Sequence, residues 1–345
     1  MKYKFNFDNR LKNNYYSTNY FLKTIDIVKN TNNVVSMQFI HFSNEDIVVC
    51  GIDETIQLLK FVLGKNFSKL EVLAQKDGNI ISSNSPLLVI KGEYKYFGQL
   101  ENIIDGILAR RSSIATNVYK IKQKINSNQD IIFMADRNDS YFQQPYDAYP
   151  AHLLGVKLFV TNAQVEFFKE DKEVKVIGTI PHALIQQFKG DLKQVIKEYN
   201  RVHLQKPYAL IDYHNNVISE LESIKSQLND VIGVRIDTSK NNIDFSLEQK
   251  GIMEYGVNHN LVKSVREWLD NNGYKNLKII VSSGINYKDI ETFAKNNTPI
   301  DYFGIGGYFL TNSVHVSADL VELNGEIETK TNRFKKDWST LKRVK

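Results

Sequence analysis

The stretch Tyr208–Asp237, YALIDYHNNVISELESIKSQLNDVIGVRID, decides the fold class of this 345-residue chain. It begins and ends with short apolar runs, YALIDYH and VIGVRID, which are typical of buried strands. Between them, NVISELESIKSQLN has the apolar spacing of an amphipathic helix. A strand, a helix and a second strand at this spacing predict a βαβ unit with parallel strands.

The same alternation continues on both sides of this stretch, starting at about residue 130. The other strand candidates are DIIFMADR, GVKLFVTN, VKVIGTIPH, LKIIVSSG and PIDYFGIGG. The other helix candidates are DLKQVIKEYNRV, NLVKSVREWLDNNG and YKDIETFAKNN. About seven such units favour a closed or nearly closed α/β barrel, and a doubly wound open sheet is the alternative.

The chain before about residue 115 mixes its elements less regularly. NVVSMQFIHF and NEDIVVCGI look like strands, and DETIQLLKFVLG looks helical. NIISSNSPLLVIKGEY predicts a hairpin or a strand pair around Ser85–Pro86. A long helix is expected from about Gln99 to Ile125, with a kink or interruption near Arg110–Ser113.

Composition limits the class of protein. Lys+Arg 44 against Asp+Glu 39 gives a net charge of +5 with interspersed signs, which suits an anionic small molecule as well as a nucleic acid. The single cysteine, Cys50, excludes an internal disulfide and a four-thiolate zinc site. The N-terminus has no secretion signal, and no apolar run approaches the ~20 residues of a membrane span. We therefore expect a cytoplasmic protein without nucleic-acid or membrane partners, whose basic residues 330–345 form a solvated tail.

Polar and charged side chains follow the predicted strands, where a parallel barrel builds its ligand site. They are Asp136–Arg137, Thr161–Asn162, Thr179 with His182, Asp212 with His214, Arg235 with Asp237, and Ser282–Ser283. For Thr161, Ser282 or Ser283 alone, capping of a helix is the better explanation. Arg235 and Asp237 point to the same side of their strand, which fits an internal ion pair and ligand binding about equally.

The last strand candidate runs into a glycine-rich segment, FGIGGYF, with Gly304, Gly306 and Gly307. Glycine lets the backbone approach a ligand and present N–H groups, which suits a phosphate, and barrels often bind phosphate in their last loops. Tight turns also use glycine, so this signal is weak alone. Together with Arg137, Arg235 and Asp237 it indicates a phosphorylated sugar, with carboxylates for ribose hydroxyls or Mg²⁺.

His182 stands at the junction of a strand and a helix in VKVIGTIPHALIQQFKGD (Val174–Asp191). We expect Thr179 to cap this helix and Pro181 to occupy its first turn. The helix dipole favours a neutral imidazole there, and such a ring could accept a phosphoryl group. A partly buried histidine of no chemical consequence is the equally weighted alternative.

These residues resemble the nicotinate phosphoribosyltransferases, which belong with the quinolinate and nicotinamide enzymes to the type II phosphoribosyltransferases. GTIPHAL (Gly178–Leu184) resembles their Gly-Thr-x-x-His motif, and ARRSSIATN (Ala109–Asn117) resembles the segment that joins their two domains. VRIDTS resembles the Arg-x-Asp-Ser signature, VSSGIN and FGIGGYF the two late loops, and YYSTNYFLKT the N-terminal tyrosine motif. The similarity covers nearly the whole chain in the right order.

The resemblance implies an irregular, TIM-like α/β barrel over 116–309 and an N-terminal, sandwich-like α/β domain over 1–115, completed by 310–345. It implies a homodimer or higher homo-oligomer with shared active sites. The implied reaction converts nicotinate, phosphoribosyl pyrophosphate and ATP to nicotinate mononucleotide, pyrophosphate, ADP and phosphate. Mg²⁺ would assist, with Asp237 as the candidate ligand.

The resemblance also implies roles for individual residues. His182 would be phosphorylated by ATP, and Asp237, helped by Asp212, would hold ribose hydroxyls or metal. The implied substrate-binding residues are Tyr20, Arg110, Arg137, Thr161, Asn162, Thr179, Arg235, Ser283, Gly284, Gly306 and Gly307. Within this set Tyr20 would stack on the pyridine ring from the partner subunit, and Arg110 would bind the pyridine carboxylate across the dimer.

Substrate choice has one clue in the sequence. The nicotinamide-using relatives carry an aspartate where VTN ends on Asn162, and an amide can donate to a carboxylate that an aspartate would repel. Departures from the family pattern are Thr18 for an aspartate, Met134 for a stacking aromatic and YHNN after Asp212. The alternatives are a decarboxylating, ATP-independent quinolinate phosphoribosyltransferase and a catalytically weakened homologue that binds nucleotide or phosphoribosyl ligands.

Overall fold

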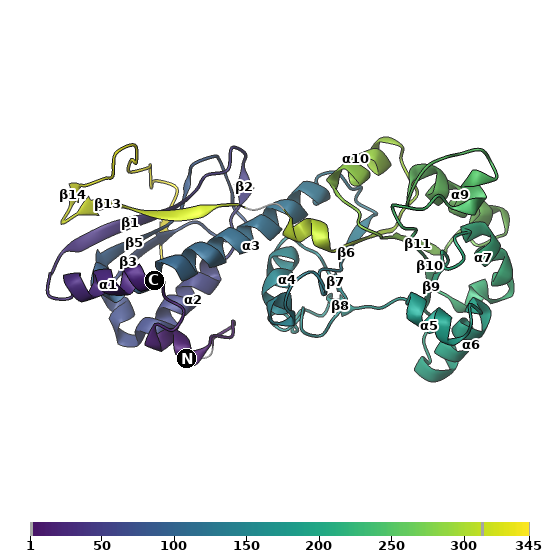
Figure 1. Cartoon of the computed structure of the whole chain (residues 1–345), viewed down its shortest axis with the longest axis horizontal. Helices are drawn as coiled ribbons and strands as arrows, with labels where there is room; N and C mark the ends of the chain where they lie inside the picture. The colour runs from purple at the N-terminus through teal and green to yellow at the C-terminus, as the bar shows by residue number, and fades with distance from the viewer. Residues whose placement is uncertain (1–2, 312–313, 345) are drawn as a thin grey trace. The chain divides into compact units, whose positions relative to one another are not determined.

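The computed structural model describes residues 3–311 and 314–344, and these form two compact units. Among the described residues, the first unit comprises 3–119, 149–154 and 314–344, and the second comprises Lys120–Ala148 and Gly155–Thr311. Figure 1 labels most of the helices and strands of both units. Each unit contains its own sheet and is described by itself.

The second unit is a barrel of seven parallel strands. They are β6 (Asp130–Phe133), β7 (Leu158–Phe159), β8 (Lys175–Val176), β9 (Tyr208–Leu210), β10 (Gly233–Ile236), β11 (Lys278–Val281) and β12 (Tyr302–Ile305). Their order, β8-β7-β6-β12-β11-β10-β9, keeps the chain order around the ring. The edge strands β8 and β9 do not pair with each other, and at the seam between them the Ile180 N–H, beyond the end of β8, donates to the Tyr208 carbonyl (3.2 Å). The predicted strands and the irregular barrel are confirmed, and the doubly wound alternative is wrong because the strand order does not reverse.

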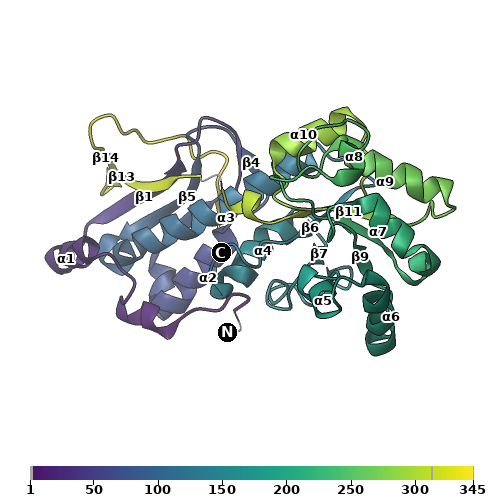
Figure 2. The same ribbon diagram turned by 45° about the vertical axis from the view of Figure 1, so that its right-hand side comes forward.

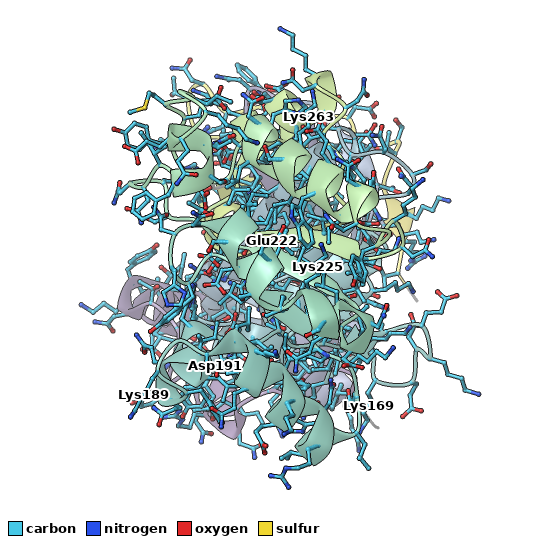
Figure 3. The ribbon with its side chains drawn as sticks, turned by 90° about the vertical axis from the view of Figure 1, so that its right-hand side faces the viewer. Lys169, Lys189, Asp191, Glu222, Lys225 and Lys263 are labelled. Atoms are coloured by element: carbon cyan, nitrogen blue, oxygen red, sulfur yellow. The ribbon has the colours of Figure 1, made fainter. Side chains whose placement is uncertain are left out.

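Amphipathic helices cover the outside of this barrel (Figure 2). The longer ones are α6 (Leu192–His203), α7 (Val217–Ser223), α9 (His259–Asn271) and α10 (Tyr287–Lys295), and the shorter ones are α5 (His182–Gln187) and α8 (Phe245–Glu248). Their apolar faces are buried, as at Val195 and Val265, while Lys263 and Glu222 lie on the outer face in Figure 3. Helix α4 (Gln144–Leu153) follows β6. Across the described parts of the chain, no helix has the length and apolarity that crossing a membrane requires.

The first unit is built on a six-stranded antiparallel sheet. Its strands are β1 (Val34–His41), β3 (Glu71–Ala74), β5 (Pro86–Glu93), β13 (Val316–Leu323), β14 (Glu326–Ile327) and β15 (Lys342–Arg343), in the order β14-β13-β1-β5-β3-β15. Helices α1 (Asn19–Val28), α2 (Ile52–Leu63) and α3 (Glu101–Lys122) belong to the same part of the chain. Leu59 of α2 and Leu108 of α3 share one core with Phe39 and Leu88 of the sheet. This layer of helices on a sheet agrees with the expected sandwich-like domain.

Helix α3 runs without a break from Glu101 to Lys122, so the predicted interruption near Arg110–Ser113 is wrong. Its polar residues are satisfied by tertiary contacts. The Ser113 hydroxyl donates to the Ala109 carbonyl one turn earlier (2.7 Å), and the Ser112 hydroxyl contacts the backbone of Cys50. Arg111 donates through Nε to the buried Glu54 (2.8 Å). A polar run inside a helix therefore marks its contact with α2 and its neighbours, not a break.

The predicted hairpin around Ser85–Pro86 is also wrong. Strand β4 (Ile80–Ile81) pairs with β2 (Ile47–Val48) in a separate two-stranded sheet, whereas β5 pairs with β1 and β3. The turn between β4 and β5 passes through Asn84 at φ 57°, so the chain changes sheets there. Neighbouring strands in sequence pair only when tertiary contacts favour it.

Most charged side chains of the basic C-terminal segment are exposed, as expected of a solvated segment, but the segment is anchored to the sheet and is not a free tail. Gln38 is buried on β1, and its amide donates to the Phe334 carbonyl (2.8 Å). The side-chain amide oxygen of Gln38 (Oε1) accepts from the Lys336 N–H and from the Trp338 indole N–H (3.0 and 3.2 Å). Lys335 pairs with Glu322 at 2.6 Å. The charge of the segment could not predict this contact, because the side chain that makes most of the anchoring hydrogen bonds is the neutral Gln38, which lies far away along the chain.

Two partly buried carboxyl groups in the first unit should make its stability depend on pH. Burial, and then the charges of Asp105 and Asp319, raise the pKa of Glu101 to about 8. Burial and then Asp319 raise the pKa of Asp105 to about 7. Both groups hold a proton more readily in the folded protein than in the unfolded chain. Their stabilising contribution is therefore present at acid pH and is lost as the pH rises from about 4 through 7 to 8.

The double variant Glu101→Gln/Asp105→Asn is expected to remove this dependence. Its melting temperature should exceed that of the parent at pH 8.5 but not at pH 5, because the amides carry no charge to bury. Thermal unfolding at both pH values measures the difference, and Asp26→Asn on the exposed face of α1 is the control. An equal effect at both pH values would contradict this assignment.

Candidate active site

A cleft of about 680 Å³ opens at the carboxyl ends of the barrel strands, and all its described lining residues belong to the second unit. The predicted site residues that line it are Arg137, Thr179, Arg235, Asp237, Ser283, Gly284, Gly306 and Gly307. They follow β6, β8, β11 and β12 or lie at the end of β10. The parallel strands bring these side chains to one mouth because each strand ends at the same rim.

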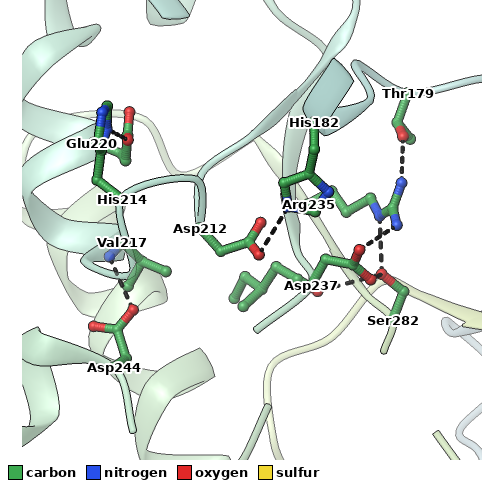
Figure 4. Close-up of polar contacts among 11 residues, drawn as sticks. Thr179, His182, Asp212, His214, Val217, Glu220, Arg235, Asp237, Asp244 and Ser282 are labelled. Atoms are coloured by element: carbon green, nitrogen blue, oxygen red, sulfur yellow. Dashed lines mark hydrogen bonds and ion pairs between the residues drawn. The ribbon is translucent and has the colours of Figure 1, made fainter. Parts of the chain in front are cut away.

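Arg235 is the centre of a hydrogen-bonded network in this cleft (Figure 4). Its Nη2 pairs with Asp237 Oδ2 at 2.8 Å, and its Nη1 donates to the Thr179 hydroxyl at 2.8 Å. Its Nε donates to Ser282 Oγ (2.9 Å), and the Ser282 hydroxyl donates to Asp237 Oδ1 (2.5 Å). The side chains of Arg235 and Asp237 are 15% and 17% exposed, so both are fixed yet reachable from the cleft. The ion pair that the strand alternation allowed is therefore present, and its polar surface faces the cleft.

Two glycine-containing backbone segments, Ser283–Gly284 and Gly306–Gly307, line the rim of the cleft. Ser283 (φ 80°) and Gly284 (φ 68°) have left-handed backbones just before Asn286, the residue that caps α10. The N-cap residue Asn286 lines the cleft, and its side chain accepts from the N–H groups of Lys288 and Asp289 in the first turn of α10. A helix N-terminus and a glycine turn both favour negative charge.

The segment after β12 lies directly against the segment after β6. A Cβ at Gly306 would lie 2.5 Å from the Met134 carbonyl oxygen and 2.9 Å from Asn138 Oδ1. A Cβ at Gly307 would lie 3.0 Å from Asn138 Nδ2. The absence of side chains at these two positions is what lets Asn138 and the glycine backbone share one wall of the cleft.

Gly306→Ala is expected to destabilise the barrel by about 1–3 kcal/mol, because its methyl group would overlap backbone atoms that cannot rotate away. The φ of Gly306 is −120°, so the penalty comes from crowding and not from backbone strain. Gly178→Ala is the matched control, since Gly178 lines the same cleft and a Cβ there meets nothing within 4 Å. Chemical denaturation measures both variants, and equal losses would show that crowding at Gly306 is not the cause.

His182 forms a pair with Asp212 beside this network. Its Nε2 lies 3.3 Å from Asp212 Oδ2, and the side chains are 44% and 6% exposed. Burial raises the pKa of Asp212, the nearby His182 ring lowers it, and the charge of Asp237 raises it. Neither member of the pair is among the described residues that line the cleft, although Asp212 interacts electrostatically with Asp237 there.

The cap predicted for the helix at His182 is wrong. Helix α5 begins at His182 itself, and its N-cap is Pro181, which offers no side-chain hydrogen bond. The Thr179 hydroxyl accepts from Arg235 instead. Local sequence rules thus assign Thr179 to the helix cap, but its hydroxyl binds Arg235 across the barrel. No local pattern in the sequence predicts this contact.

Four predicted site residues lie elsewhere. Thr161 accepts from the Gln164 N–H and donates to Gln144, so it stabilises its own turn, and neither Thr161 nor the exposed Asn162 is among the described lining residues. Tyr20 and Arg110 belong to the first unit. Tyr20 is 62% exposed on α1, and Arg110 lies within α3.

Sequence reasoning missed several residues of the cleft: Asn138, Asn286, Tyr308 and Thr311. Asn286 could have been found, because Asn followed three residues later by Asp289 is a capping-box pattern, and the structure shows both of its hydrogen bonds. Asn138 carries no comparable signal, since only its contact with the glycine segment identifies it.

The described residues contain no group of three or more His, Cys, Asp or Glu side chains arranged to hold a metal ion. Mg²⁺ does not require such a cage, because it keeps several waters and binds through one or two carboxylates together with substrate phosphates. Asp237 and Asp136 line the cleft and are of the right chemical type. The donor set therefore fits Mg²⁺ that arrives with a phosphate-bearing substrate.

Three comparisons bear on the family. Residues 20–112 match the family model described as the quinolinate phosphoribosyl transferase N-terminal domain. A nicotinate phosphoribosyltransferase of Bacillus subtilis (strain 168) is 23% identical over 244 residues, which cover 69% of this chain and 45% of that protein. The chain thus spans less than half the length of this curated relative.

Solved structures share the fold. The nicotinate-nucleotide pyrophosphorylase of Pyrococcus furiosus superimposes with a TM-score of 0.78 and 24% identity, over 97% of this chain and 82% of that one. Human nicotinic acid phosphoribosyltransferase superimposes with a TM-score of 0.67 and 13% identity, over 93% and 77%. Together the comparisons show similarity to quinolinate and nicotinate phosphoribosyltransferases and do not distinguish between them, and the solved structures show a shared fold.

Proposed function

We propose that this protein is a phosphoribosyltransferase of NAD biosynthesis that transfers a phosphoribosyl group to nicotinate and couples the transfer to ATP. The observation that carries the proposal is that two features lie next to each other at the mouth of the barrel. One is a cleft with the Arg235–Asp237 pair and two anion-favouring backbone segments, and the other is the His182–Asp212 pair beside it.

The reaction asks for positioning and charge stabilisation more than for proton transfer. The bond from ribose C1 to the pyrophosphate oxygen breaks while the pyridine nitrogen bonds to C1. Asp237 would accept from ribose hydroxyls, and Arg235 would face the phosphates. The segments at Gly284 and Gly306 would hold the 5′-phosphate through backbone N–H groups. Mg²⁺, when bound, would neutralise charge on the leaving pyrophosphate.

The charge of the cleft favours nicotinate over quinolinate. The charged side chains among its described lining residues are Arg137, Arg235, Asp136 and Asp237, whose formal charges cancel. Arg235 is already paired, which leaves Arg137 as the exposed cation for the acceptor among these residues. Nicotinate carries one carboxylate and quinolinate two, and each buried carboxylate needs its own partner.

His182 would accept the γ-phosphoryl group of ATP. Asp212 contacts Nε2, which leaves the Nδ1 lone pair to attack phosphorus while ADP departs. The Asp212 carboxylate would hold the proton on Nε2 and balance the positive charge that develops on the ring. The later transfer of this phosphoryl group to water gives phosphate, so the cycle consumes one ATP.

A homodimer would complete the site. Tyr20 is a large aromatic side chain exposed on α1, and it would stack on the pyridine ring bound by the partner subunit. Arg110 would reach the same acceptor carboxylate as Arg137 from the partner subunit, so that the two cations share one anionic group. This assembly is proposed on the family resemblance and on the exposure of Tyr20.

A quinolinate phosphoribosyltransferase is the second candidate. It is favoured by the match of residues 20–112 to the quinolinate N-terminal domain. The His182–Asp212 pair favours the first candidate, because the quinolinate reaction uses no ATP and needs no phosphorylated histidine.

Steady-state assays with nicotinate, nicotinamide and quinolinate, each with and without ATP, separate these candidates. The expected result is turnover of nicotinate that ATP stimulates, with ADP formed in the same amount as nicotinate mononucleotide. Carbon dioxide release from quinolinate without ATP would establish the second candidate. No turnover of any acceptor would refute both.

A further inference from the structure

A second histidine–carboxylate pair lies close to the first and has no role in the proposed reaction. His214 Nδ1 lies 2.5 Å from Glu220 Oε1, with side chains 59% and 4% exposed. His214 belongs to the same short segment after β9 as Asp212, and Glu220 lies on α7 (Figure 4). The buried Glu220 carboxylate thus fixes the orientation of an otherwise exposed ring.

The other side of the His214 ring rests on the turn that ends α5. A Cβ at Gly190 would lie 2.8 Å from His214 Nε2, 3.1 Å from its Cε1 and 3.4 Å from the Tyr213 ring. The Gly190 N–H donates to the Ile185 carbonyl (3.0 Å), which closes the last turn of α5. Gly190 has a φ of 90°, a conformation that favours glycine. Because glycine has no side chain, the turn lies directly against the His214 ring.

Helix α5 is therefore held at both ends by one segment. Asp212 contacts His182 at its first residue, and His214 covers Gly190 just beyond its last turn. The helix has six residues, too few to be stable alone, so contacts from outside must fix its position. A shift of its C-terminal end would carry His182 away from Asp212.

We propose that Glu220 and His214 form a positioning pair that holds α5 in place, so that His182 stays on Asp212 and accepts the phosphoryl group. This inference rests on the proposed phosphohistidine role of His182. His214 acts through α5 and touches neither substrate nor the reacting atoms. Misplacement of a reacting group by about 1 Å costs on the order of 10²-fold in rate, so a small displacement of α5 suffices.

The experiment compares His214→Ala, His214→Asn and the parent in two single-turnover reactions. The first is transfer of ³²P from [γ-³²P]ATP to protein, read as acid-labile phosphohistidine. The second is ATP-independent formation of nicotinate mononucleotide. His214→Ala is expected to slow phosphorylation by about 10- to 100-fold and to leave the ATP-independent reaction within about twofold. His214→Asn should recover most of the rate, because its amide can still donate to Glu220.

A pair of glycine variants tests the contact between His214 and Gly190 from the side of Gly190. Gly190→Ala puts a methyl group between the turn and the His214 ring and should slow phosphorylation as His214→Ala does. Gly273→Ala is the matched control, with a similar φ of 87° and nothing within 4 Å of its Cβ. It carries the same backbone strain and should leave phosphorylation unchanged.

Histidine side-chain ¹H–¹⁵N spectra give a readout without substrate. In His214→Ala the His182 resonances should lose the signature of the Asp212 contact, while circular dichroism stays that of the parent. Equal phosphorylation rates in parent and His214→Ala, or equal loss of both reactions, would overturn the positioning role. A parent protein that forms no phosphohistidine at all would instead refute the ATP coupling, and this inference with it.

Discussion

Replacing His182 with alanine is expected to abolish the stimulation of nicotinate turnover by ATP and to leave a slow, ATP-independent transfer. The imidazole is the group that would carry the phosphoryl, and it lies beside the cleft network, so the cleft should still bind its substrates. Loss of a covalent nucleophile removes the whole coupled pathway, a fall in ATP-dependent rate of at least about 10³-fold. ADP release and nicotinate mononucleotide formation measured together show the uncoupling.

The control for this variant is His203→Ala, which removes an exposed histidine at the end of α6. It should match the parent in both products. Full ATP coupling in His182→Ala would sink the phosphohistidine role and leave the pair with Asp212 as a structural contact only.

Replacing Asp237 with asparagine is expected to reduce kcat/KM by about 10²- to 10³-fold in reactions with and without ATP. Asp237 is the counterion of Arg235 (2.8 Å) and the acceptor of the Ser282 hydroxyl (2.5 Å). The amide leaves a largely buried guanidinium without its partner charge and offers one acceptor oxygen where the carboxylate offers two. The substitution should therefore disturb both the position of Arg235 and the proposed contact with ribose hydroxyls.

His182→Ala and Asp237→Asn are distinguished by which reactions they impair. Asp237→Asn should impair every turnover, whereas His182→Ala should impair only the part that uses ATP. Asp230→Asn, at an exposed carboxylate beyond α7, is the matched control for the change of charge. A kcat/KM for Asp237→Asn within about threefold of that of the parent would place the sugar elsewhere in the cleft.

The barrel and most of the residues at its mouth could be predicted from the sequence, because both follow from short-range patterns. Seven apolar runs at regular spacing predicted the strands, and the residues at their ends predicted Arg235, Asp237 and the glycine segment. Alternation along β10 even predicted that Arg235 and Asp237 share one side.

The features that sequence reasoning missed depend on partners far along the chain. Thr179 looked like a cap and serves Arg235, which is 56 residues away. The polar run in α3 looked like a break and is satisfied by Cys50 and Glu54. The C-terminal segment looked solvated and is held by Gln38 across nearly 300 residues of chain. In each case a local preference was outweighed by a tertiary contact that no periodicity reports.

The seam between β8 and β9 has a consequence for how the barrel moves. Between β10 and β11 a ladder of four residue pairs must break before the strands part, whereas at the seam the backbone link is the hydrogen bond from Ile180 to Tyr208. His182 follows this link by two residues. The segment that carries His182 therefore lies beside a joint with less backbone hydrogen bonding than the β10–β11 pair, so local opening there would break fewer hydrogen bonds.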